Sequence, residues 1–92
     1  MASYEGKELT KYEVALLRKM FYHGYIGARH TDEDSVIRGF PKHERGKIKK
    51  ELEKLVRKNL VIEYPSTGQT HVSLNPFQIA AVKQILESAN NC

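Results

Sequence analysis

The fold is decided by residues 52–64, LEKLVRKNLVIEY, in which a helical pattern passes directly into a strand. Apolar residues recur at helical spacing on one side of this helix, namely Ile48, Leu52, Leu55 and Val56. Asn59 suits the left-handed position that ends a helix, and the β-branched and aromatic residues of 60–64 favour a strand. The stretch therefore predicts a helix over 42–58 that leads without a linker into a sheet.

A β-hairpin and a last helix are predicted after this junction. The turn PSTG at 65–68 separates the strand at 60–64 from QTHVSL at 69–74, which alternates in polarity. Asn75 and Pro76 provide an N-cap and a first-turn proline for an amphipathic helix that ends at about Ser88.

Two further helices are predicted before the junction. Thr10 and Glu13 have the spacing of a capping box, which starts a helix over 11–23, and Gly24 supplies its left-handed end. Tyr25, Ile26 and Ala28 form a short strand or bridge in this interpretation. A second cap, Thr31 with Asp34, opens a helix of about two turns that stops at Gly39, before the tight connection at Phe40 and Pro41.

The predicted order is helix, short strand, helix, helix, hairpin, helix. Over residues 10–74, through the helix-turn-helix and LEKLVRKNLVIEY, this order resembles the winged-helix family. The resemblance implies a mostly α, α+β fold with a three-helix core and a β-hairpin wing, the third helix acting as recognition helix and 65–69 as wing tip. The helix at 75–88 looks like the dimerisation helix of small archaeal and viral winged-helix proteins. We expect a single domain over 1–92, with a tail at 1–9.

The basic charge of the chain is concentrated on the predicted third helix. Residues 41–58 hold eight of the fifteen Lys and Arg residues and three acids. At about 100° per residue, the positions opposite the apolar side are His43, Gly46, Lys47, Lys50, Lys54 and Arg57. An ordinary solvated face mixes charges of both signs, whereas this one favours a polyanion.

Each of these positions receives an expected role. His43, Arg45, Lys47 and Lys50 are candidate contacts to base edges, although the angle of Arg45 points toward the core side. Lys54 and Arg57 are expected to be phosphate contacts or dimer-side surface, and Lys42 could also reach the DNA backbone, helped at the flank by Arg29 or Lys11. Gly46 has two interpretations: it lets the backbone approach a phosphate or base edge, or it relieves crowding against the second helix.

The wing departs from the family pattern because residues 59–82 contain no Lys or Arg. Contacts from Ser66, Thr67, Gly68 and Gln69 would be neutral hydrogen bonds, and His71 would add charge only when protonated.

Catalytic and metal chemistry is not indicated. His23, His30, His43 and His71 share no metal-ligand spacing, and Cys92 is interpreted as a terminal thiol without a role, or as a cross-link between two chains. No phosphate loop or nucleophile motif is present, so we expect no enzyme, no cofactor, no metal and no small-molecule ligand. The five tyrosines, including Tyr4, are attributed to packing rather than base stacking. Without an apolar run of membrane length, a cytoplasmic chain is expected.

The leading functional hypothesis is a transcriptional regulator that binds double-stranded DNA as a homodimer. Dimerisation is expected from the last helix and from the helix at 11–23, which has more apolar residues than one small core needs. Two alternatives remain open: a winged-helix module that binds an acidic protein surface, and an RNA binder.

Overall fold

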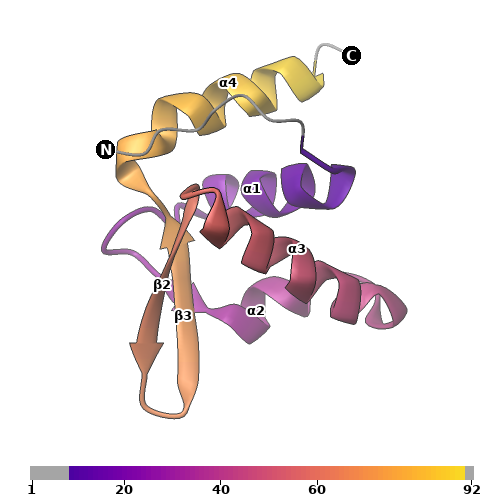
Figure 1. Ribbon diagram of the computed structural model, residues 1–92, viewed down its shortest axis with the longest axis vertical. Helices are drawn as coiled ribbons and strands as arrows, with labels where there is room; N and C mark the ends of the chain where they lie inside the picture. Colours follow the sequence, from indigo (N-terminus) through magenta and orange to yellow (C-terminus); the bar gives the residue numbers. More distant parts are fainter. Residues whose placement is uncertain (1–8, 91–92) are drawn as a thin grey trace.

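The computed structural model describes residues 9–90, which form a mostly helical α+β structure (Figure 1). Within this range, four α-helices accompany a sheet of three antiparallel strands. The α-helices and strands are, in chain order, α1 (Lys11–His23), β1 (Thr31–Asp32), α2 (Glu33–Ile37), α3 (Arg45–Arg57), β2 (Val61–Ser66), β3 (Gln69–Leu74) and α4 (Ile79–Asn90). The predicted α+β class is confirmed. The predictions made for Tyr4 and Cys92 concern residues outside the described range.

Helix α1 has the predicted bounds and both predicted ends. The Glu13 N–H donates to Thr10 Oγ1 (3.2 Å), and the Thr10 N–H donates to Glu13 Oε1 (3.0 Å), which completes the capping box. Gly24 follows with φ 74°, in the left-handed region, where its N–H donates to the carbonyls of Met20 and Phe21.

The second helix begins later than predicted, and a two-residue strand precedes it. The short strand or bridge predicted at 25–28 is present as a bridge, because Ile26 forms an isolated parallel bridge with Leu74. The strand β1 was not predicted, and it pairs antiparallel with β3 through Thr31 and Asp32. The predicted cap at Thr31 is therefore wrong, because this residue belongs to the sheet. Asp32 caps α2 instead, accepting from the Ser35 N–H (3.0 Å) and the Ser35 hydroxyl (2.6 Å).

The cap of α2 makes the stability of the fold sensitive to acid. The hydrogen bond from the Ser35 hydroxyl lowers the pKa of the Asp32 carboxyl below its ordinary value of 3.8. A carboxyl with a lowered pKa stabilises the folded state above its unfolded pKa, and this contribution is lost as the pH falls through the folded pKa. We expect Asp32→Asn, which keeps an acceptor but does not titrate, to flatten the fall in melting temperature below pH 3.8. An unchanged pH profile in thermal melts would contradict this role.

The segment predicted as one helix over 42–58 has two parts. Lys42–Glu44 form a 3-10 helix, α3 then runs from Arg45 to Arg57, and Lys58 already lies outside it. Asn59 has φ 66°, so its predicted left-handed stop is confirmed. Helix α2 ends at Ile37 rather than Gly39. The last helix likewise begins with a 3-10 turn, Pro76–Gln78, and α4 extends to Asn90 instead of Ser88.

The sheet has the order β1-β3-β2, and β2 and β3 form the predicted hairpin, although β2 runs on through Pro65 and Ser66, so that the turn is shorter than the predicted 65–68. In Figure 1, α1 lies between α4 and α3, α2 lies beside α3, and the hairpin projects beyond the helices. The core between them includes Leu17, Met20 and Val36 besides the expected side of α3, where Ile48, Leu52 and Leu55 are buried and Val56 is half-buried. This packing leaves the opposite side of α3 on the surface. None of the helices in residues 9–90 combines the length and the apolar character needed to cross a membrane.

Candidate nucleic-acid interface

The exposed side of α3 carries cations without acids among them. At about 100° per residue, Lys47, Lys50, Lys54 and Arg57 fall within an arc of about 80°, and all four are exposed. We call these four residues the basic face of α3. The acids of the helix lie elsewhere, because Glu51 is buried and Glu53 is exposed beyond the edge of this arc, toward the hairpin.

Lys54 is the most neutralised member of the basic face. Its Nζ lies 3.3 Å from Glu51 Oε2, and its side chain is 46% exposed. The Glu51 Oε2 atom is nevertheless a buried oxygen without a hydrogen-bond partner among the described residues, so this contact is an ion pair by distance and not a well-directed hydrogen bond. Lys50 and Arg57 have no ion pair within residues 9–90.

The cationic surface continues from α3 onto α1. Lys47 Nζ lies 4.9 Å from the centre of the Tyr12 ring, and Lys11 Nζ lies 5.3 Å from the centre of the same ring. Both distances are within the range of cation–π attraction. The Tyr12 ring therefore holds two ammonium groups at the border of α1 and α3, and Lys11 has the flanking position that the sequence suggested.

At the start of α3, the two basic residues of the preceding 3-10 turn are exposed, and the first residue of α3 makes internal contacts. Lys42 and His43 are exposed on the 3-10 turn, and His43 Nε2 lies 3.7 Å from Glu44 Oε1. Arg45 is half-buried, and its guanidinium donates from Nε to the Phe40 carbonyl (3.2 Å) and from a terminal nitrogen to the Arg38 carbonyl (3.1 Å). Arg45 thus holds the start of α3 against the turn that follows α2.

A second cation holds the same turn from α1. Lys19 Nζ donates to the Val36 carbonyl (2.9 Å) and lies 5.5 Å from the centre of the Phe40 ring. Burial lowers the pKa of this ammonium group. Lys19 was not recognised in the sequence, because nothing in its helical position shows that its side chain reaches α2. Together, Lys19 and Arg45 hold α2 and the turn after it against α1 and against the start of α3.

We expect Arg45→Ala to lower the free energy of unfolding by about 1–2 kcal/mol, because two carbonyls lose a charged donor at a partly exposed site. Arg45→Lys should recover little, since an ammonium group cannot span both carbonyls as a guanidinium does. Urea denaturation measures the free energy of unfolding of both variants. Normal stability combined with a loss of nucleic-acid binding would make Arg45 a direct contact instead.

The hairpin tip is neutral, as its sequence indicates. Thr67, Gly68 and Gln69 are exposed, and Gly68 has φ 77° at the turn; the side chain of Ser66 is outside the described structure. His71 lies within β3, away from the tip. It is half-buried, and its Nδ1 lies 2.8 Å from His30 Nδ1. His71 therefore contacts His30 beside the sheet and does not lie at the hairpin tip.

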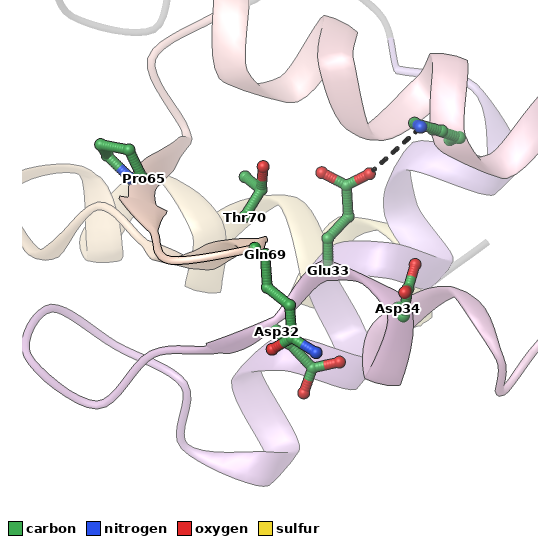
Figure 2. Close-up of a pocket in the computed structure, with 8 residues that line it drawn as sticks. Asp32, Glu33, Asp34, Pro65, Gln69 and Thr70 are labelled. Atoms are coloured by element: carbon green, nitrogen blue, oxygen red, sulfur yellow. Dashed lines mark ion pairs between the residues drawn. The ribbon is translucent and has the colours of Figure 1, made fainter.

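A groove with acidic walls separates the hairpin from α3. It has a volume of about 380 Å³ and is lined by Asp32, Glu33, Asp34, Lys49, Pro65, Gly68, Gln69 and Thr70. Figure 2 shows Glu33 pointing toward α3, where its Oε1 lies 3.9 Å from Lys49 Nζ. Burial raises the pKa of the Glu33 carboxyl; Lys49 opposes this rise, and Glu63, Asp34 and Glu53 add to it. Lys49 is exposed, and the sequence had not singled it out.

The two flanks of α3 consequently differ in charge. The side toward α1 carries Lys11, Lys47 and Lys54, and the side toward the hairpin carries the acids of the groove. The first flank therefore has a positive potential, whereas on the second flank three acids, Asp32, Glu33 and Asp34, outnumber Lys49 in the lining of the groove.

Residues 9–90 contain no group of three or more His, Cys, Asp or Glu side chains arranged to hold a metal ion. Comparisons of the chain with protein-family models, with curated proteins and with solved structures find no match. The functional proposal therefore rests on the geometry and charge described above.

Proposed function

We propose that this chain is a winged helix-turn-helix protein that binds double-stranded DNA with α3 in the major groove. The element order supports this assignment: α2 and α3 are joined by a short turn, α3 leads into the β2–β3 hairpin, and β1 completes the sheet. An α-helix fits the major groove, and the α3 side opposite the core is exposed along its length.

The single observation that carries the proposal is the basic face of α3. Lys47, Lys50, Lys54 and Arg57 are all exposed on one side of the helix, and the acids of α3 lie off that side. Each Lys or Arg that neutralises a phosphate releases condensed counterions, which favours binding to duplex DNA. Lys42 and His43 would extend the contact at the start of α3, where base edges are reached.

The hairpin contributes less than the helix in this proposal. Its tip offers neutral donors and acceptors, and the acidic groove beside it repels phosphates. The DNA backbone would therefore follow the flank of α3 that faces α1, where Lys11 and Lys47 meet at Tyr12. Thr67, Gly68 and Gln69 remain candidates for neutral contacts.

In the same proposal, the protein forms a homodimer and regulates transcription. It would act in the cytoplasm, bound to the nucleoid. Two large aromatic side chains are exposed away from the basic face, Tyr22 on α1 (70%) and Phe77 before α4 (78%). Next to Tyr22, a hollow of about 210 Å³ is lined also by Phe21, Lys83, Leu86 and Glu87. Apolar surface of this kind supports self-association, and a two-fold dimer would place two α3 helices in successive major grooves about 10 base pairs apart.

Selection of bound duplexes from a random pool tests the proposal directly. We expect enrichment of sites with two-fold symmetry, and a linear decrease of log affinity with log salt concentration for the enriched duplex. The absence of enrichment, together with affinity that does not depend on salt, would refute DNA binding. A matched RNA duplex as competitor separates the RNA alternative.

A protein-binding module is the second candidate, favoured by the hairpin that lacks Lys and Arg and by the acidic groove. In that case the basic face of α3 docks on an acidic protein surface. Duplex binding that is weak, insensitive to sequence and unaffected by charge reversal of Lys47, Lys50 and Lys54 would support it.

A further inference from the structure

Gly46 lies in a helix without a structural reason to be glycine. It is the second residue of α3, and its φ is not positive. A Cβ atom built on Gly46 would meet no atom within 4 Å, so crowding against α2 does not explain it. Because glycine is less favourable in helices than any residue but proline, this position weakens α3 for no gain within the fold.

Exposed basic residues lie one helical turn before and one turn after Gly46. At about 100° per residue it lies about 160° around α3 from the buried Ile48, so it faces outward. The residues one helical turn before it are Lys42 and His43, and those one turn after it are Lys49 and Lys50. All four are exposed. Gly46 also forms part of the wall of a groove of about 580 Å³, whose charged lining residues are Arg38, Arg45 and Lys49 together with Asp32 and Asp34.

We propose that Gly46 is a steric determinant of recognition, at which base edges of the bound duplex come into van der Waals contact with the α3 backbone. This inference rests on the proposed DNA binding. A side chain at this position would add a carbon about 1.5 Å from Cα on the outward side. It would hold the whole helix away from the groove and lengthen the contacts of the surrounding lysines.

The inference is tested with Gly46→Ala and Gly46→Met in the full chain, against the duplex enriched from the random pool. Both variants should melt at a higher temperature than the wild type, because alanine and methionine favour the helix. Affinity should nevertheless fall about tenfold for alanine and further for methionine, comparable to overpacking a close contact. The slope of log affinity against log salt should stay unchanged, because no cation is removed.

Ala28→Met is the size control, since Ala28 is exposed in the loop before β1, outside α3 and outside the surface proposed for self-association. It should leave affinity unchanged. Gly46→Ala binding as tightly as the wild type, or more tightly, overturns the inference and leaves the proposed function standing. If the wild-type chain binds no duplex in the pool, the proposed function fails, and the role of Gly46 fails with it.

Discussion

Replacement of Lys47, Lys50 and Lys54 together by alanine is expected to weaken binding to duplex DNA by roughly 10²–10³-fold near physiological salt. These side chains are exposed on one side of α3, and within the described residues Lys54 has an ion pair, with Glu51, whereas Lys47 and Lys50 have none. The variant should fold normally, because all three lysines lie outside the core. Fluorescence anisotropy over a salt series measures the effect, and the slope of log affinity against log salt should flatten by about one for each lysine removed.

The single substitutions should lower the affinity for DNA by different amounts. Lys54 is paired with Glu51 at 3.3 Å, so part of its charge is already neutralised, whereas Lys50 has no ion pair within the described residues. We therefore expect Lys50→Ala to cost more affinity than Lys54→Ala. Lys83→Ala removes an exposed lysine on α4, away from α3 but in the hollow beside Tyr22, so it should leave the salt slope unchanged when binding is compared at the same oligomeric state. If the slope of log affinity against log salt concentration were the same for the wild type and the triple variant, these lysines would not bind phosphate.

The parts of the fold that depend on local chemistry were predictable from the sequence. The capping box at Thr10 and Glu13, the left-handed Gly24 and Asn59, and the hairpin are all confirmed, because each depends on residues near one another in the chain. The start of α2 was placed wrongly for the opposite reason. Whether Thr31 caps a helix or joins a strand depends on its pairing with Val72, which lies far away in the sequence.

The candidate site divides in the same way. Helical periodicity was sufficient to place Lys47, Lys50, Lys54 and Arg57 on the side opposite the core. The contacts that position α2 and α3 could not be predicted, because Lys19 donates to a backbone carbonyl of α2 and Arg45 donates to two carbonyls of the turn after α2. The acidic groove could not be predicted either. Its lining residues come from β1, α2, α3 and the hairpin, which only the tertiary fold brings together.

The ion pair between Glu13 and Lys58 explains how α3 is held at its other end. Glu13 is 1% exposed, and its Oε2 accepts from Lys58 Nζ at 2.7 Å, while its Oε1 accepts from the Thr10 N–H. One carboxylate therefore caps α1 and anchors the residue that follows α3, immediately before the junction with β2. The Lys58 side chain is 22% exposed, so its ammonium group has limited access to water if the partner is lost.

Glu13→Ala is accordingly expected to lower the free energy of unfolding by about 3–5 kcal/mol, because it removes the Glu13 half of the capping box and leaves Lys58 largely buried without its counter-charge. For a domain of this size, such a loss corresponds to a fall in melting temperature of tens of degrees. Glu13→Gln, which keeps the shape of the side chain, should lose less and remain measurable if the alanine variant does not fold. Urea denaturation and thermal melts followed by circular dichroism give both values.

Two comparisons isolate the buried pair from the other effects of removing Glu13. In the double variant Glu13→Leu with Lys58→Met, no charge is left unpaired, so stability should recover part of the loss seen for Glu13→Leu alone, and the mutant cycle gives the coupling. Lys49→Ala breaks the more exposed pair with Glu33, at 3.9 Å, and should cost about 1 kcal/mol or less. Equal losses for Glu13→Ala and Lys49→Ala would mean that the contact with Lys58 does not hold α1 to the end of α3.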